Sequence, residues 1–150
     1  MFYKGIRVGK GGKNFRMIKF RTMVPDADKI GGPSTSADDP RLTKIGKFLR
    51  KHNLDELPQL INILKGEMSF VGPRPEVPSE VATYDEETKK IILSVKPGMT
   101  DLATLANLHE EEILRGSKDP HQTYREKIKP QKLKLAKEYV KKHSFLLDIK

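Results

Sequence analysis

The 150-residue sequence contains no cysteine and no tryptophan, and aromatic residues make up only 7% of it. Without cysteine the chain has no disulfide bond and no thiolate metal site, which is compatible with a reducing compartment. Few aromatic residues, no recognition helix and no RNA-binding motif argue against nucleic acid as a partner. No apolar run approaches the roughly 18 residues that span a bilayer, and no signal peptide is visible. We therefore expect this chain alone to be soluble or peripheral.

Positive charge is what the sequence has in excess. Lysine and arginine number 29 against 20 aspartate and glutamate residues, which gives a net charge of +9. Such a balance favours anionic partners: nucleic acid, phosphorylated metabolites or an acidic membrane surface. The length of 150 residues favours a single domain, residues 1–150. The hydrophobic content of 36% and the charged content of 33% indicate that its core is thin.

The N-terminal region is predicted to form a β-hairpin. Ile6–Val8 and Phe15–Met23 are rich in β-branched and aromatic residues, and the glycine-rich segment Gly9–Lys13 lies between them. That glycine cluster fits a turn and not a nucleotide-binding loop, because no helix follows it at the required spacing. Residues 25–40 have no hydrophobic period and many Gly, Ser, Asp and Pro residues, so they are predicted to be a loop.

The rest of the chain is predicted to be mainly helical. Leu57, Leu60, Ile61 and Leu64 recur at helical spacing; Pro58 is tolerated in a first turn, and Gly66 ends the helix. The fold class is therefore α+β, an N-terminal β-hairpin packed on several α-helices and mostly helical overall. The other expected helices are a basic one over 41–52, one over 79–95 with Val81, Tyr84, Thr88, Ile91, Ile92 and Val95 inward, a short acidic one over 108–114, and a last one over 130–142.

Asp55 and Glu56 are adjacent carboxylates at a helix start, close in sequence to many cations. The simplest interpretation is structural: carboxylates in a first turn favour the helix dipole, and Asn53 with Glu56 resembles a capping box. The functional alternative makes Asp55 a nucleophile toward phosphorus and Glu56 a ligand of Mg²⁺. A helix N-terminus keeps a carboxylate ionised, and Mg²⁺ takes one or two carboxylates together with substrate phosphates.

The segment Gly72–Pro75 holds Arg74 between two prolines, which restrict the backbone on both sides. A planar guanidinium held in this way suits two-point contact with a phosphate. A rigid connector with a solvated arginine is an equally good interpretation from the residues alone.

Further cations could join such a site. Lys19 and Arg21 share one face of the second predicted strand, while Ile18 and Phe20 face the core. Arg50 lies five residues before Asp55 near a helix end, and a turn there would bring its guanidinium back toward the carboxylates. Arg41 is the fourth candidate. Any one of Lys19, Arg21 and Arg41 taken alone is more simply a solvated surface charge, whereas Arg50 is favoured as a site residue. The four histidines have no metal-ligand spacing.

Three collinear segments carry a family resemblance. Phe15–Met23, Asp39–Arg50 and Leu54–Pro75 resemble the bacterial sugar transferase family, the monotopic polyprenol-phosphate phosphoglycosyl transferases, and the match resumes at Lys96–Thr100. The resemblance implies transfer of a sugar-1-phosphate from a UDP-sugar donor to a membrane polyprenyl phosphate acceptor, which initiates glycoconjugate assembly.

The resemblance also implies roles for residues. The phosphosugar would become covalently bound to Asp55, with release of the nucleoside monophosphate, and Glu56 would be linked to Mg²⁺. Lys19, Arg50, Pro73 and Arg74 fall on the family's functional positions and, together with Arg21 and Arg41, are the predicted phosphate-binding residues.

The family works at the cytoplasmic face of the bacterial inner membrane. Its members carry an apolar re-entrant helix before the hairpin, and we expect that anchor to be absent from this chain. The alternatives are an inactive fragment and a basic module that binds anions or nucleic acid, and a steep salt dependence of nucleic-acid binding would favour the latter.

Overall fold

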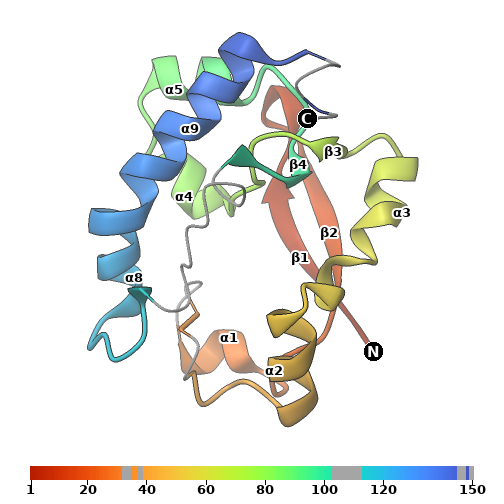
Figure 1. The fold of residues 1–150 in the computed structure, drawn as a ribbon, viewed down its shortest axis with the longest axis vertical. Helices are drawn as coiled ribbons and strands as arrows, with labels where there is room; N and C mark the ends of the chain where they lie inside the picture. Colours follow the sequence, from red (N-terminus) through yellow and green to blue (C-terminus); the bar gives the residue numbers. More distant parts are fainter. Residues whose placement is uncertain (32–34, 37–38, 103–112, 145–147, 149–150) are drawn as a thin grey trace.

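The computed structural model describes residues 1–31, 35–36, 39–102, 113–144 and 148, and its architecture is α+β, as predicted (Figure 1). A two-stranded antiparallel hairpin and a separate two-stranded parallel pair are surrounded by helices. In chain order the elements are β1 Phe2–Val8, η1 Lys10–Gly12, β2 Asn14–Phe20, α1 Ala27–Ile30, α2 Lys44–Lys51, η2 Leu54–Glu56, α3 Gln59–Leu64, β3 Ser69–Val71, α4 Pro78–Ala82, α5 Glu86–Ile92, β4 Gly98–Thr100, α8 Pro120–Thr123, η3 Tyr124–Ile128 and α9 Lys129–Lys142.

The predicted hairpin is confirmed. β1 and β2 pair in register from Phe2 opposite Phe20 to Val8 opposite Asn14. The connection turns through Gly11 and Gly12, whose φ angles of 67° and 76° lie in the left-handed region that glycine adopts readily. The first strand begins at Phe2, earlier than expected, and the second ends at Phe20. The predicted loop over 25–40 contains one helical turn, α1.

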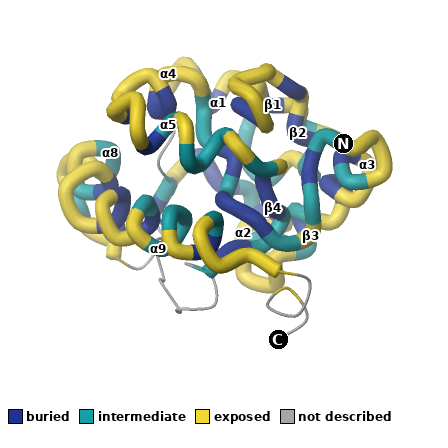
Figure 2. The backbone as a smooth tube through the Cα atoms, turned by 90° about the horizontal axis from the view of Figure 1, so that it is seen from above, coloured by how far each residue is buried: buried dark blue, intermediate teal, exposed yellow. Residues whose placement is uncertain are grey.

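The segment 54–64 is a nearly continuous helical rod, because Leu57 and Pro58 between η2 and α3 also have right-handed helical angles. Gly66 ends it with a φ of 76°, as predicted. Its orientation is unexpected, since the inward residues are polar: Asp55, Gln59 and Asn62 are buried. Exposed positions follow α3 and the turn before it (Figure 2), and they include the apolar residues of the predicted stripe, Leu57, Leu60, Ile61 and Leu64. We call these four residues the apolar face of α3.

The prediction of a single helix over 79–95 is wrong, because the structure has two helices there, α4 and α5. Asp85 starts the second one: its carboxylate accepts hydrogen bonds from the backbone N–H and the hydroxyl of Thr88, at 2.7 and 2.8 Å. An aspartate N-cap favours a new helix start over continuation of the previous helix. Val81, Tyr84 and Thr88 are buried as expected, and Ile91, Ile92 and Val95 are half-buried.

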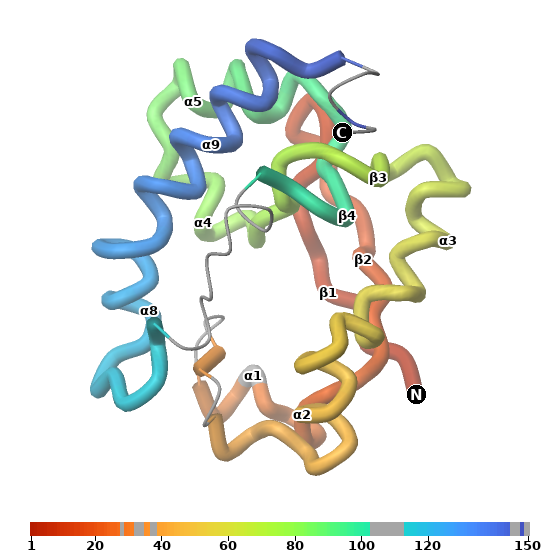
Figure 3. The backbone as a smooth tube through the Cα atoms, viewed as in Figure 1, coloured from red at the N-terminus to blue at the C-terminus, as the bar shows by residue number. Residues whose placement is uncertain are grey.

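The C-terminal helices pass along α4 and α5, on the side of the molecule away from α3 (Figure 3). α9 closely matches the helix predicted over 130–142. Glu80 of α4 holds them in place by accepting Lys129 Nζ at 2.5 Å and Arg125 Nη2 at 2.8 Å. The acidic helix predicted over 108–114 lies mostly outside the described residues.

Two glycines bring β4 against the loop that carries Arg74. A Cβ atom added to Gly98 would lie 2.1 Å from the backbone nitrogen of Gly72, far inside van der Waals contact. The parallel pairing of β3 with β4 depends on this close approach, and the Gly72–Pro75 loop leaves directly from β3. Buried apolar residues form three small clusters in the described part of the chain, which agrees with the thin core expected.

Candidate functional site

Three elements bring two cations onto one carboxylate. Lys19 from the end of β2 donates to Glu56 Oε1 at 2.8 Å, and Arg74 from the Gly72–Pro75 loop donates to the same oxygen. Glu56 lies in η2, whose position against β2 is set by the packing of the 54–64 rod on the hairpin. Residues far apart in sequence therefore meet at the Asp55–Glu56 pair, as the sequence predicted for Lys19 and Arg74.

Burial disfavours the charged form of both Glu56 and Lys19. It acts to raise the pKa of Glu56, but the charges and hydrogen bonds of Arg74 and Lys19 outweigh it and lower that pKa to about 2. For Lys19, burial and the nearby Arg74 charge outweigh the attraction of Glu56 and Asp55, and the pKa falls to about 8. Glu56 is therefore a firmly ionised anion, whereas Lys19 is the cation of the site that can lose its proton in mildly alkaline solution.

The neighbouring carboxylate of Asp55 has the opposite environment. Its residue is only 7% exposed, yet no other described residue makes a side-chain hydrogen bond or ion pair with it. The capping box considered from the sequence is not formed: Asn53 has a left-handed backbone and makes no side-chain cap hydrogen bond, while Glu56 is engaged by the two cations. One carboxylate is thus fixed by cations and the other is held beside it with its lone pairs uncommitted.

The other predicted cations are Arg41, Arg50 and Arg21. Arg41 is buried and forms a two-point ion pair with Asp39, at 2.9 and 2.7 Å, and Nη1 donates to the Ala27 carbonyl. The charge of Arg50 helps to lower the pKa of Asp39, behind the stronger hydrogen bonds from Arg41. Arg21 is exposed and makes no side-chain bond to another described residue. The structure therefore gathers Lys19, Glu56 and Arg74, and gathers Arg41 and Arg50 separately around Asp39.

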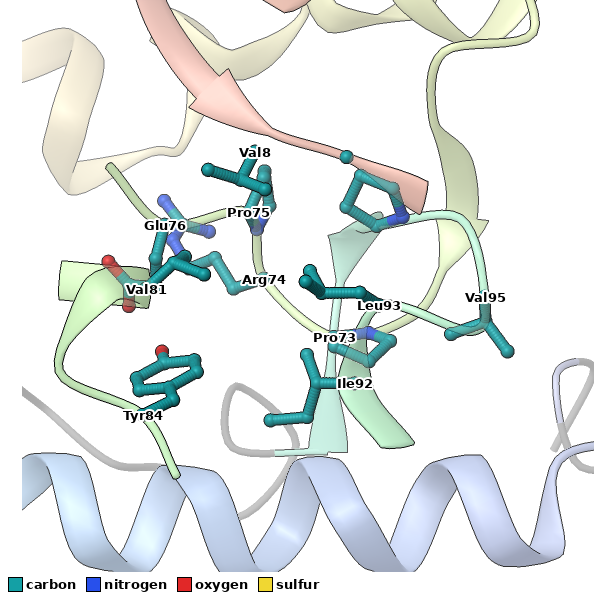
Figure 4. Close-up of a pocket in the computed structure, with 12 residues that line it drawn as sticks. Val8, Pro73, Arg74, Pro75, Glu76, Val81, Tyr84, Ile92, Leu93 and Val95 are labelled. Carbon is teal, nitrogen blue, oxygen red and sulfur yellow. The ribbon is translucent and has the colours of Figure 1, made fainter. Parts of the chain in front are cut away.

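Pro73 precedes Arg74 directly in the loop. Its ring is buried and lines a small, mainly apolar pocket beneath the Arg74 loop (Figure 4). Its carbonyl accepts the N–H of Gly98 at 3.0 Å, which fixes the loop to β4. Without an N–H of its own, Pro73 stiffens the segment that presents Arg74. The pocket is also lined by Val8, Pro75, Val81, Tyr84 and Leu93.

Two buried polar residues beside the site were missed by the sequence analysis. Gln59 and Asn62 follow Asp55 at helical spacing on the inward side of the rod, and both are almost completely buried. Among the described residues, the Gln59 amide nitrogen has no hydrogen-bond partner, whereas the Asn62 amide bonds β2. Their spacing from Asp55 was the available signal, but polar residues on an amphipathic helix ordinarily face solvent.

The oxygen ligands at the site suit a hard cation. The described residues contain no group of three or more His, Cys, Asp or Glu side chains able to hold a metal by themselves. Both of the cation contacts given above for Glu56 use Oε1, so these contacts with Lys19 and Arg74 do not use its Oε2, and Asp55 is the adjacent residue in the chain. Mg²⁺ commonly binds through one or two carboxylates, with substrate phosphates and water completing its octahedron. The donor set therefore fits a magnesium ion that is shared with a phosphorylated ligand.

An uncommitted carboxylate flanked by Lys19 and Arg74 is suited to nucleophilic attack at a phosphorus centre whose negative oxygens the cations receive. A sequence comparison identifies the family of the chain. The profile of the family described as bacterial sugar transferase matches residues 1–150. The chain therefore belongs to the bacterial sugar transferase family.

Individual relatives share between two fifths and half of the aligned residues. The chain is 43% identical over 111 residues to the undecaprenyl-phosphate galactose phosphotransferase of Salmonella typhimurium, which covers 64% of the chain and 23% of that protein. It is 42% identical over 117 residues to the exopolysaccharide production protein ExoY of Sinorhizobium fredii, 68% of the chain and 51% of that protein. A third relative, the UDP-N-acetylgalactosamine-undecaprenyl-phosphate N-acetylgalactosaminephosphotransferase of Aeromonas hydrophila, is 41% identical over 103 residues.

The chain spans about a quarter to a half of the length of these curated relatives. Among the residues that the structure describes, no helix has both the length and the apolar character needed to cross a membrane.

Proposed function

We propose that this chain transfers a sugar-1-phosphate from a UDP-sugar to a polyprenyl phosphate, through a covalent intermediate on Asp55. The observation that carries the proposal is the contrast within the carboxylate pair: Glu56 is paired with Lys19 and Arg74, and Asp55 is buried beside them without a bond to a described side chain. A nucleophile must have free lone pairs, while the residue beside it can hold cations or a metal. The names of the Salmonella and Aeromonas relatives describe this type of transfer.

The proposed reaction has two balanced displacements. In the first, an Asp55 oxygen bonds the phosphorus that carries the sugar, and the bond from that phosphorus to the bridging oxygen breaks, releasing UMP. In the second, a phosphate oxygen of the polyprenyl acceptor attacks the same phosphorus and the bond to Asp55 breaks. The product is a polyprenyl diphosphate sugar, and the Asp55 carboxylate is restored. Lys19 and Arg74 receive the phosphate charge in both steps.

We infer that Glu56, through Oε2, is the residue that would hold Mg²⁺ together with the donor's phosphates. When bound, the ion would neutralise part of the diphosphate charge and so make UMP a better leaving group. Glu56 would keep its carboxylate charged for this purpose over the whole neutral range, since Arg74 and Lys19 lower its pKa to about 2.

The apolar face of α3 lies on the rod that carries Asp55 and is exposed. Leu57, Leu60, Ile61 and Leu64 are all exposed on the outer side of the rod whose inner side carries Asp55. On the basic helix α2, Ile45 and Phe48 are exposed as well. Apolar residues beside lysines favour the surface of an anionic bilayer. We propose that this side of the protein rests on the cytoplasmic face of the membrane, where a polyprenyl phosphate is anchored.

Covalent trapping tests the nucleophile. The chain is incubated with Mg²⁺ and a UDP-sugar labelled in the phosphate next to the sugar, and the peptides are then examined by mass spectrometry. We expect label on Asp55 in the wild type and none in Asp55→Asn. Asp85→Asn is the matched control, because asparagine retains the N-cap of α5 far from the site. Normal turnover by Asp55→Asn, or label on another residue, would show that Asp55 is not the nucleophile.

Vesicle co-sedimentation tests the membrane side. The double substitution Leu60→Ser and Ile61→Ser removes apolar surface and replaces only exposed residues, so the fold should be retained. We expect the double variant to bind anionic phospholipid vesicles several-fold more weakly than the wild type. Equal binding by the two proteins would exclude the apolar face of α3 as the contact.

A further inference from the structure

The side-chain amide of Asn62 bonds the backbone of β2 at two points. Asn62 is completely buried, with 0% of its surface exposed. Its Oδ1 accepts the N–H of Ile18 at 3.0 Å, and its Nδ2 donates to the carbonyl of Arg16 at 2.9 Å. The same Nδ2 donates to Glu67 at 2.7 Å, which fixes the orientation of the amide. The amide therefore has a partner for each of its polar atoms.

The two bonds are made to the edge of β2 that does not pair with β1. In an antiparallel pair, the peptide groups of alternate residues point toward the partner strand and away from it. Met17 lies opposite Gly5 of β1, and the N–H of Ile18 and the carbonyl of Arg16 flank Met17 on the outer edge of β2. The Asn62 amide supplies at that edge the acceptor and the donor that the peptide group of a third strand would supply. The two bonds tie one pair of β2 peptide groups to α3 and so hold β2 at this register along the helix.

A second contact joins the same two elements one residue further along. Lys19 follows Ile18 directly, and its Nζ donates to Glu56 Oε1 at 2.8 Å. Glu56 and Asn62 both belong to the 54–64 rod, so the rod holds the backbone of β2 at one end and the side chain of Lys19 at the other. The apolar cluster between hairpin and rod, including Phe15 and Met17, is non-directional and leaves sliding along the rod unopposed.

We propose that Asn62 is a positioning residue, which sets the place of Lys19 against the Asp55–Glu56 pair through its hold on β2. The proposal rests on the proposed function for its catalytic consequence, but its structural part is independent of that function. Asn62 itself is buried beneath the strand and would not touch substrate.

One variant removes both bonds. Asn62→Leu has a similar volume and makes neither bond to β2. The matched control is Thr88→Val, which removes a buried side-chain hydrogen bond in α5 and no contact with β2. For every readout we expect Asn62→Leu to differ from the wild type and Thr88→Val to equal it.

Three readouts follow the proposed chain of effects. In Asn62→Leu, amide exchange at Ile18 should become about tenfold faster or more, because a buried hydrogen bond is lost. Acylation of Lys19, followed by peptide mass spectrometry, should also be about tenfold faster as the ion pair with Glu56 opens. Turnover at saturating UDP-sugar should fall about tenfold or more, because displacement of a catalytic cation by a fraction of an ångström already slows chemistry.

The outcomes are separable. Unchanged Lys19 acylation in Asn62→Leu, with Ile18 exchange accelerated, would show that the bond to β2 does not position Lys19. Equal losses in Asn62→Leu and Thr88→Val would reduce Asn62 to a general contributor to stability. If the wild type transfers no phosphosugar, the proposed function fails, and the exchange and acylation results still decide whether Asn62 positions Lys19.

Discussion

The ion pairs of Glu80 test how strongly the C-terminal helices are held against α4. The Glu80 side chain is 3% exposed and accepts Lys129 Nζ at 2.5 Å, and Lys129 itself is nearly buried. Glu80→Gln keeps the shape but leaves the Lys129 charge without its counterion. Breaking a buried ion pair from one side costs about 3–5 kcal/mol of folding free energy. For a chain of this size that predicts a melting temperature lower by about 6–20 °C.

The effect has a defined pH dependence. Burial acts to raise the pKa of Glu80, but hydrogen bonds and charges from Lys129 and Arg125 outweigh it, so the pKa lies below its ordinary value. A carboxyl group with a lowered folded-state pKa stabilises the fold above its unfolded pKa of about 4.3, and this contribution is lost as the pH falls further. The difference between wild type and Glu80→Gln should therefore be full at neutral pH and shrink as the pH is lowered below about 4.

The stability of each variant is measured by urea unfolding at neutral pH and at a pH below about 4. Glu86→Gln is the matched control at both pH values. Glu86 pairs with Lys89 at 2.8 Å, but its side chain is 91% exposed, and such surface pairs contribute little to stability. The reasoning would be refuted if Glu80→Gln unfolded at the same urea concentration as Glu86→Gln at neutral pH. If the difference in unfolding free energy between wild type and Glu80→Gln were the same at acid pH as at neutral pH, the loss of stability would not come from the charge of the carboxylate.

Two further predictions concern the loop and the second charge cluster. Gly98→Ala should destabilise the protein by about 3 kcal/mol or more in urea unfolding, because its Cβ would lie 2.1 Å from the Gly72 nitrogen; stability equal to the wild type would show that β4 can move away. Arg41→Met should lower stability by about 3 kcal/mol, because buried Asp39 loses its partner, while the KM for the UDP-sugar stays unchanged. A raised KM with normal stability would return Arg41 to the phosphate site.

Local patterns in the sequence predicted the elements whose ends are set locally. The hairpin follows from two β-rich runs around Gly9–Lys13, and Gly66 ends the rod because it alone adopts the left-handed angle there without cost. The break between α4 and α5 was missed, because the apolar period continues through Tyr84 and Thr88. A cap at Asp85 interrupts the helix without interrupting that period.

Periodicity also cannot tell which side of a helix faces inward. The spacing of the leucines in 57–64 is helical as predicted, but the buried side is the one with Asp55, Gln59 and Asn62. For Asn62 the burial is compensated by hydrogen bonds to the backbone of β2, and these partners are visible only in the folded chain.

The candidate site was predicted in part. Lys19 and Arg74 were identified, and both contact Glu56 in the structure. A count of charges could not separate them from Arg41, whose guanidinium is engaged by Asp39 two residues before it. Asn62 was missed because its contribution lies in bonds to backbone, which leave no trace in the residue types of β2.

The inverted rod has a consequence for the distance over which the two substrates of the proposed reaction would meet. An α-helix with its side chains is only about 10 Å thick. Asp55 lies on one side of that thickness and the exposed leucines on the other. A phosphate tethered to a hydrocarbon chain outside would need to travel little more than the width of one helix to reach the carboxylate. A water-soluble nucleotide would approach from the hairpin side. The rod would then separate the membrane, on the side of the leucines, from the aqueous solution, on the side of Asp55.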